Sequence, residues 1–222
     1  MNQAARIIAF PTKAKAKKQS RIKNIDGVKY FSSKQVKLLR RTVKDQAATG
    51  KMTAVREWMV IDLLTSTGLR VSEAADLRCG DLKLGYGDSR VFVRDGKGSI
   101  SGHVIIPDSL KKHLKSYLKW KQEQGELTGK DDHLFIGQRG AITSQAIQQI
   151  VKKYLKQINI YESGKSVHAL RHSYAMELYK REKDLRAVQK QLRHVSIQST
   201  LVYADTTNEE LASQVKGLWG QA

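Results

Sequence analysis

The spacing of apolar residues predicts that the chain is mainly helical. Apolar side chains recur at helical intervals through residues 53–67 and cover most sides of that segment, so we expect it to be the central buried helix. Residues 144–158 carry a single apolar stripe, which is typical of an amphipathic helix packed on a core. The members of that stripe are Ile147, Ile150, Val151, Tyr154, Leu155 and Ile158.

Residues with helix-capping chemistry stand at the ends of such segments. Ser32 and Gln35 form an S-x-x-Q capping box, the helix that follows is expected to end at Gly50, and Gly68 is placed to stop the central helix. Short oxygen-bearing side chains accept hydrogen bonds from the first free N–H groups of a helix, so further residues of this kind predict helix starts. These are Ser72, Asp108, Thr143 or Ser144, Asp184 and Ser196.

Two short segments follow a strand pattern. Residues 90–94 and 103–106 alternate between apolar and polar side chains, and Asp95-Gly96-Lys97-Gly98 between them is a turn sequence. The pattern predicts a hairpin with Lys97 at its tip. The sequence therefore predicts an α+β fold that is mainly α-helical, with a small antiparallel sheet, in one domain over residues 31–206.

The two ends of the chain differ from this domain. Residues 1–30 are expected to form a basic flexible arm, because residues 1–25 contain seven Lys or Arg and no acid. Residues 207–222 predict a last helix, opened by a T-x-x-E capping box and carrying one apolar face. That helix either docks in trans on a neighbouring subunit or packs on its own core. Its apolar face consists of Leu211, Val215 and Leu218.

Composition and charge point to a polyanionic partner. The chain has 222 residues, 40% of them hydrophobic, which is enough to bury a core, and a formal net charge of +19. Such a charge favours phosphate contacts, and double-stranded DNA is preferred to a membrane because the sequence shows no long apolar run and no signal peptide. We therefore expect a cytoplasmic, DNA-associated protein. Cys79 is the only cysteine, which excludes an internal disulfide and a cysteine-based zinc site, and it is expected to be a packed thiol.

Candidate chemistry gathers toward the C-terminus. His168 and Arg171 are three residues apart and share one face of a helix, so both can face one anion. His194 follows the next predicted helix, and Tyr203 stands nine residues beyond it. A free phenol has a pKa of about 10, so only about one in a thousand is ionised at pH 7. A tyrosine nucleophile would therefore need cationic neighbours.

This H-x-x-R, His and Tyr spacing resembles the tyrosine recombinase (phage integrase) family. Thr67-Gly68-Leu69-Arg70 resembles the family's first arginine motif, and Gly96-Lys97-Gly98 resembles its lysine turn. The resemblance implies a recombinase catalytic-domain fold over about residues 30–205, which we expect without the family's usual N-terminal core-binding domain. It implies six catalytic residues, with Glu73 as a supporting acid. The six are Arg70, Lys97, His168, Arg171, His194 and Tyr203.

The resemblance also implies a reaction, DNA cleavage and rejoining by a recombinase or integrase of the kind found in mobile genetic elements. Tyr203 would form a 3′-phosphotyrosyl bond, and two arginines would bind the nonbridging phosphate oxygens through charge-assisted hydrogen bonds. Lys97 would protonate the leaving 5′ oxygen, with His168 assisting and His194 bonding the phosphate. No cofactor or metal is needed, and a homo-oligomer on DNA is expected.

Three residues near this motif carry separate expectations. Arg193 precedes His194 where the family usually has glycine, and a left-handed conformation would cost a non-glycine residue about 1 kcal/mol. We therefore expect that the helix ends differently or that His194 is displaced, unless Arg193 adds a phosphate contact. His172 has no role in the motif and is expected to be structural. A zinc site at His168 and His172 is disfavoured, because no glutamate lies between them and Arg171 would repel the cation.

Two other functions remain open from the sequence. A nicking and closing enzyme that resembles type IB topoisomerases would use the same residues without exchanging partners. A DNA-binding accessory protein of the same fold would no longer cleave. The intact set of catalytic residues argues against the accessory protein, and Arg193 argues mildly for it.

Overall fold

The computed structural model describes residues 28–94, 101–137, 140–204 and 216. The basic arm up to residue 27, the hairpin tip with Lys97 and the expected last helix apart from Lys216 lie outside the described residues.

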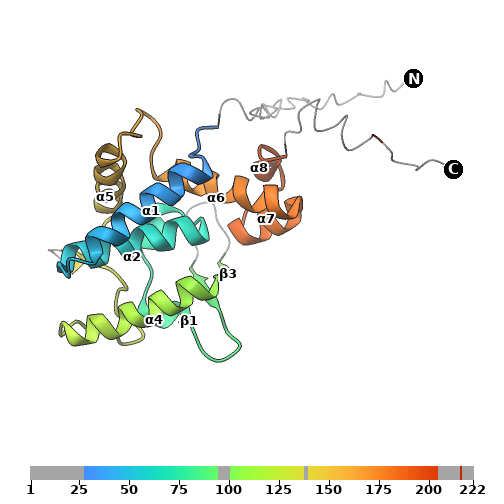
Figure 1. Cartoon of the computed structure of the whole chain (residues 1–222). Coiled ribbons are helices and arrows are strands. Elements are labelled where there is room, and N and C mark those ends of the chain that lie inside the picture. Colours follow the sequence, from blue (N-terminus) through green and yellow to red (C-terminus); the bar gives the residue numbers. More distant parts are fainter. Residues whose placement is uncertain (1–27, 95–100, 138–139, 205–215, 217–222) are drawn as a thin grey trace, which may run out of the picture.

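Helices make up most of the described chain, as the apolar spacing predicts, and they surround a central one (Figure 1). They are α1 (Ser33–Ala47), α2 (Met52–Thr67), α3 (Val71–Ala75), α4 (Asp108–Glu123), α5 (Ser144–Gln157), α6 (Val167–Glu182), α7 (Leu185–Leu192) and α8 (Gln198–Leu201), with a 3₁₀ turn at Cys79–Asp81. The central helix is α2, which contacts α1, α4, α5 and α6. Its side chains at Met59, Val60, Ile61 and Leu63 are fully buried, which confirms the expected central buried helix.

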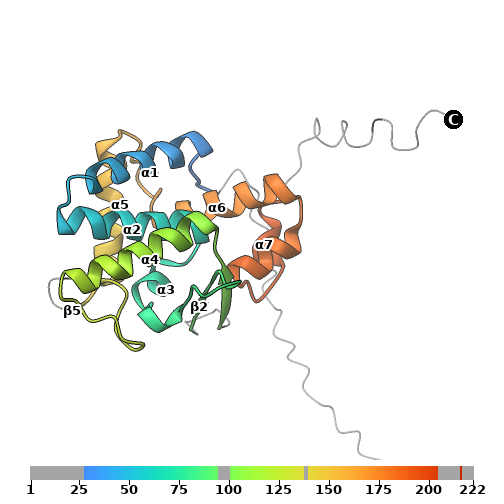
Figure 2. The ribbon, with the colours of Figure 1, turned by 60° about the horizontal axis from the view of Figure 1, so that its bottom comes forward.

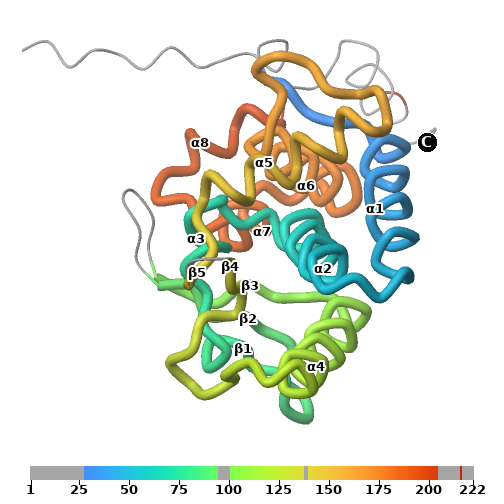
Figure 3. Tube along the Cα trace, turned by 90° about the vertical axis from the view of Figure 1, so that its left-hand side faces the viewer, coloured from blue at the N-terminus to red at the C-terminus, as the bar shows by residue number. Residues whose placement is uncertain are grey.

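Two small antiparallel sheets complete the fold and confirm the predicted class. The first has the strand order β1 (Leu82–Lys83), β2 (Arg90–Val93), β3 (Gly102–Ile105), and Val91 faces Val104 in its register. The second pairs β4 (Ile136–Gly137) with β5 (Gly140–Ala141). In Figure 3 the strands lie in the lower half of the molecule beside α4, below α5, α6 and α7. The strands β1, β4 and β5 were not predicted, because two residues cannot display an alternating pattern.

Helix capping agrees with the sequence at several ends. Ser32 and Gln35 form the reciprocal capping box, Gly68 ends α2 in the left-handed conformation, and Thr143 and Asp184 accept backbone hydrogen bonds at the starts of α5 and α7. Helix α1 already ends at Ala47, so Gly50 lies in the turn after it.

Three predicted helix starts need correction. Ser72 lies inside α3, because the preceding residue with extended backbone angles is Arg70, whose N–H donates to Glu73 Oε2. Asp108 is the first residue of α4 rather than its cap, since Pro107 holds the extended conformation before it. Ser196 Oγ accepts from Gln198 N, but Ile197 is the residue that precedes α8.

The C-terminal elements form a second, smaller apolar cluster beside the main core. Figure 2 shows α6 and α7 together at one side of the molecule. The cluster consists of Ala175, Met176, Val188, Leu192 and Tyr203. It therefore fixes the segment after α8 against α6 and α7. Within the described ranges, none of the helices has the length and apolar character that crossing a bilayer requires.

Candidate active site

A buried carboxylate, Glu73, draws three arginines together. Its Oε1 lies 2.9 Å from Arg70 Nη1 and 2.6 Å from Arg193 Nη2, and its Oε2 lies 3.9 Å from Arg171 Nη1. Burial alone would raise the pKa of Glu73, but the close contact and charge of Arg193 and the hydrogen bonds from Arg70 hold it below its usual value. Glu73 is therefore ionised at neutral pH and fixes residues from three separate parts of the sequence.

Arg171 is held at the meeting point of three helices. Its Nη1 donates to Gly68 O at the end of α2, and its Nη2 donates to Leu192 O at the end of α7. The packing at this point also requires glycine, because a Cβ at Gly68 would lie 2.5 Å from the Tyr174 ring. Burial and the charge of Arg70 lower the pKa of Arg171 to about 10, so the guanidinium stays protonated at neutral pH.

Arg193 shows how the chain accommodates a residue other than glycine. It adopts φ 53° and ψ 45° at the end of α7, so the helix does end in the left-handed conformation and the expectation of a different ending is wrong. Its side chain is buried and pairs with Glu73 at 2.6 Å, in a geometry outside that of a hydrogen bond. Its Nε and Nη1 have no hydrogen-bond partner in the described part of the chain. The ion pair with Glu73 therefore offsets the free-energy cost of the left-handed backbone at Arg193.

His194 follows directly, and its environment keeps it neutral. Its Nδ1 lies 2.8 Å from Thr200 Oγ1, on the buried side of α8. Burial, together with the charges of Arg171 and Arg70, lowers the pKa of His194 to about 4. At neutral pH, His194 is therefore a hydrogen-bonding group without charge. Thr200 was not singled out from the sequence, although it stands on the short helix expected there.

Tyr203 is buried, with 2% of its surface exposed, and its hydroxyl lies 2.7 Å from His172 Nδ1. Burial raises the pKa of Tyr203 to about 12, and the charges of Arg171 and Arg70 partly oppose that rise. His172, which was expected to be structural, thus contacts the hydroxyl of the predicted nucleophile. A signal existed in the sequence, since His172 directly follows Arg171, but the spacing of the family motif does not include it.

His168 and Lys97 are the remaining two predicted site residues. His168 lies on α6 one turn before Arg171 and is exposed. Lys97 is outside the described residues, but the hairpin that carries it begins beside the site. Gln191 of α7 exchanges two hydrogen bonds with the backbone of Ile105 on β3. A Cβ at Gly102, where β3 begins, would lie 3.3 Å from Arg193 Cδ.

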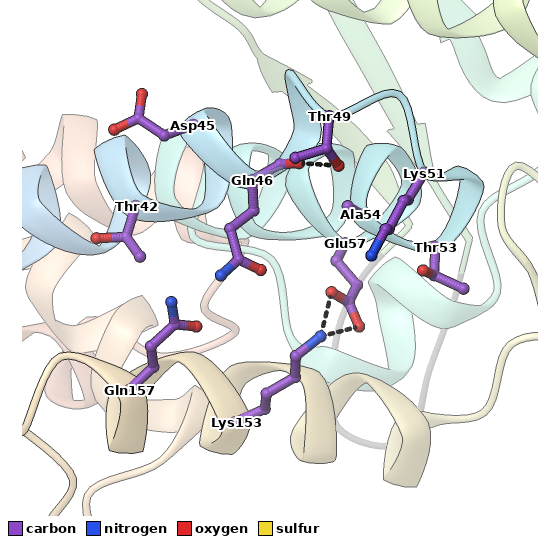
Figure 4. Close-up of a pocket in the computed structure, with 10 residues that line it drawn as sticks. All are labelled: Thr42, Asp45, Gln46, Thr49, Lys51, Thr53, Ala54, Glu57, Lys153 and Gln157. Atoms are coloured by element: carbon purple, nitrogen blue, oxygen red, sulfur yellow. Dashed lines mark hydrogen bonds and ion pairs between the residues drawn. The ribbon is translucent and has the colours of Figure 1, made fainter.

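A polar pocket of ≈ 680 Å³ lies elsewhere, between the end of α1, the start of α2 and α5 (Figure 4). Lys153 and Glu57 form an ion pair across it at 2.7 Å, and Tyr154 donates to the same Glu57 oxygen. Helix α2 rises about 1.5 Å per residue, so its start lies more than about 20 Å from the end that carries Gly68. This pocket is therefore separate from the candidate site.

The arrangement has the features needed to bind and polarise a phosphate. Arginines bind phosphate oxygens through forked, charge-assisted hydrogen bonds, and a neutral imidazole can add a further donor. The buried phenol lies within the field of Arg70 and Arg171, which favours its ionised form. The geometry thus joins a potential oxygen nucleophile to an anion-binding group.

Comparison with known proteins finds tyrosine recombinases among the relatives of this chain. The chain is 34% identical over 156 residues to the tyrosine recombinase XerC of Herpetosiphon aurantiacus, a match that covers 70% of this chain and 49% of the relative. It is 35% identical over 160 residues to the tyrosine recombinase XerD of Oceanobacillus iheyensis, covering 71% of this chain and 52% of the relative. The chain thus spans about half the length of the curated relatives it matches.

Solved structures and a family model agree with these relatives. The XerA recombinase superposes with a TM-score of 0.67 at 25% identity, covering 87% of this chain and 64% of that one. XerH bound to its difH substrate in a pre-cleavage complex gives a TM-score of 0.67 at 27% identity, covering 83% and 52%. The model of the phage integrase family matches residues 29–210. Because this match covers most of the chain, the chain belongs to the phage integrase family.

Proposed function

We propose that the chain is a site-specific DNA recombinase or integrase that cleaves and rejoins double-stranded DNA through a 3′-phosphotyrosyl intermediate. The observation that carries the proposal is the buried Tyr203 hydroxyl within the field of Arg70 and Arg171. The net charge of +19 supports a DNA partner, and the XerH relative was solved bound to its difH substrate. The protein would act in the cytoplasm, bound to its DNA partner.

The arginines would bind the nonbridging oxygens of the scissile phosphate. A guanidinium has five N–H donors, and Arg171 uses two of them on the carbonyls of Gly68 and Leu192. The donors that remain would bind the phosphate in the proposed complex. Because Glu73 and two backbone carbonyls fix these side chains beforehand, little reorganisation is needed as charge develops in the transition state.

His194 would donate a hydrogen bond to the same phosphate. If Nδ1 accepts from the Thr200 hydroxyl, the neutral ring carries its proton on Nε2, which is the donor that a phosphate requires. Thr200 would therefore fix the tautomer of His194. Lys97 would act as the general acid for the leaving 5′ oxygen, and His168, exposed on α6, would assist proton movement.

A nicked suicide substrate tests the proposal, because loss of a short 5′-hydroxyl fragment after cleavage traps the covalent product. We expect the wild-type chain to form an SDS-resistant protein–DNA adduct. Tyr203→Phe should form none while keeping its affinity for DNA, since the change removes one oxygen and no cation. An adduct formed by the Phe variant would assign the nucleophile to another residue.

Strand exchange would also need a homo-oligomer on DNA, in which residues 207–222 dock on a neighbouring subunit. The support is the apolar face of that segment in the sequence, because such a face requires a partner surface. A chain truncated after Asp205 should still bind DNA but should not form multimers on paired sites. If it aggregates or melts at a lower temperature instead, the segment packs on its own core.

A further inference from the structure

The hydrogen bond between Tyr203 and His172 joins the nucleophile to a residue that the motif leaves without a role. His172 is half-buried on α6, directly after Arg171, and its Nδ1 lies 2.7 Å from the Tyr203 hydroxyl. The two rings are tilted by 52°, with centroids 5.8 Å apart. A hydroxyl at hydrogen-bond distance from a ring nitrogen is in reach of direct proton transfer.

A buried phenol needs such a proton acceptor. The pKa of Tyr203 is about 12, so only about one hydroxyl in 10⁵ is ionised at pH 7. The nearby arginines lower this barrier but cannot themselves take the proton. A base in contact with the hydroxyl removes the need for ionisation before attack, because proton transfer and bond formation then occur together.

Other titratable groups around the site are less suited to this task. Glu73 is held ionised by Arg70 and Arg193, which makes it a weak base. His194 has its Nδ1 beside Thr200, and its pKa of about 4 makes it a weak base as well. His168 is exposed one turn earlier on α6.

We propose that His172 is a catalytic residue that accepts the Tyr203 proton on Nδ1 during cleavage and returns it during rejoining. The inference rests on the proposed function. In the forward step the Tyr203 O–H bond breaks, its proton moves to Nδ1, the Tyr203 oxygen bonds to phosphorus, and the bond from phosphorus to the 5′ oxygen breaks. The 5′ oxygen takes a proton from the separate acid assigned to Lys97. In the reverse step the 5′ hydroxyl attacks, and His172 protonates the departing Tyr203 oxygen.

The net charge of the neighbouring arginine cluster favours this cycle when DNA is bound. Glu73 pairs with Arg70 and Arg193 and lies 3.9 Å from Arg171, so three positive charges face one negative charge, and the cluster opposes a further cation on the imidazole. The incoming phosphodiester adds a negative charge that increases in the transition state. The imidazolium is therefore stabilised at the moment when it forms, which couples proton transfer to the presence of substrate.

The variant His172→Gln tests the assignment, because a glutamine amide can accept a hydrogen bond from Tyr203 but cannot take its proton. With the full-length chain on the nicked suicide substrate, single-turnover cleavage should fall by about 10²–10⁴. Affinity for uncleaved DNA and melting temperature should stay unchanged. The matched control is His133→Gln. His133 precedes β4, and its backbone carbonyl lies 3.4 Å from Lys121 Nζ, away from the candidate site. This variant should cleave at the wild-type rate.

Two further readouts separate a proton acceptor from a residue that only orients the ring. The wild-type rate should rise with pH and then level off, whereas the Gln variant should continue to rise toward the pKa of Tyr203. A substrate with sulfur in place of the bridging 5′ oxygen needs no acid, so it should rescue Lys97→Ala but leave His172→Gln impaired.

The outcomes are distinguishable from a failure of the proposed function. If Tyr203→Phe still forms the adduct, the proposed nucleophile is wrong whatever His172 does. If wild type forms the adduct at Tyr203 and His172→Gln cleaves equally fast or faster, this inference is overturned, and the hydrogen bond only restrains Tyr203 before DNA binds.

Discussion

Arg193→Gly is the most informative single change in this chain, because it removes a strained backbone and a buried ion pair together. Arg193 ends α7 with φ 53°, where glycine would be unstrained. Its guanidinium is buried and lies 2.6 Å from Glu73 Oε1. The two effects have opposite signs, and the measured stability therefore reports which one is larger.

Loss of the ion pair should change the free energy of unfolding more than relief of the backbone strain. Replacing a non-glycine residue in the left-handed region by glycine stabilises a protein by about 1 kcal/mol. Removing one partner of a buried pair costs about 3–5 kcal/mol, because the other charge is left without compensation. Glu73 keeps Arg70 at 2.9 Å, which reduces that cost. We expect a net loss of about 2 kcal/mol, or a melting temperature lower by about 4–8 °C in a chain of this size.

The chain provides a matched control in Lys183. It ends α6 with φ 54°, so it has the same backbone strain as Arg193, but its side chain is exposed and its ammonium lies 5.5 Å from the centre of the Tyr179 ring. Lys183→Gly should therefore raise the melting temperature by up to about 4 °C. The difference between the two glycine variants isolates the buried pair. Arg193→Ala, which keeps the strain and loses the pair, should be the least stable of the three.

Thermal melting and urea unfolding at pH 7 measure all three variants. The reasoning fails if Arg193→Gly melts at or above the wild-type temperature while Lys183→Gly behaves as expected. That result would mean that the pair with Glu73 contributes less than the strain of the helix end.

Three further predictions follow from the site and the charge. Arg171→Lys should lower the cleavage rate by about 10² or more and also the melting temperature, because lysine has a single nitrogen in place of the two that donate to the carbonyls of Gly68 and Leu192. The free energy of unfolding should fall as pH falls from about 6.5 toward 4, because the histidine at position 194 binds a proton in the unfolded chain but stays neutral in the folded one. Glu73 should add a further loss at lower pH, because its pKa is lowered in the folded state. In a plot of melting temperature against pH, His194→Gln should flatten the upper part of the curve. Deleting residues 1–25 should reduce the slope of log affinity against log salt by about 0.9 for each DNA phosphate that the arm neutralises, which filter binding at several salt concentrations measures.

Local signals in the sequence predicted the helices well. The apolar residues of α2 and α5 repeat over four or five turns, and capping residues such as Ser32 and Asp184 act on N–H groups only two or three positions away. The errors also have local causes. Ser72 and Asp108 were preferred as caps by residue type, but the backbone turns one or two residues earlier, at Arg70 and at Pro107.

The contacts within the site could not be predicted in the same way, because they join distant segments. The spacing identified Arg70, Arg171, His194 and Tyr203 only through resemblance to a family. Nothing in the sequence indicates that Glu73 lies beside a residue 120 positions later, or that Arg171 bonds the ends of two other helices. Packing alone brings those groups together.

The contacts of Arg193 with distant parts of the sequence affect the reaction as well as stability. Its charge is among those that lower the pKa of His194 and that of Glu73. Without it, both groups would bind protons more readily, so their pKa values would rise toward those of the unfolded chain. The stability lost on acidification would then be smaller in Arg193→Gly, and cleavage would lose His194 as a neutral donor at a higher pH than in wild type. Arg193 therefore affects the protonation of the site in two ways, through its contact with Glu73 and through its charge near His194.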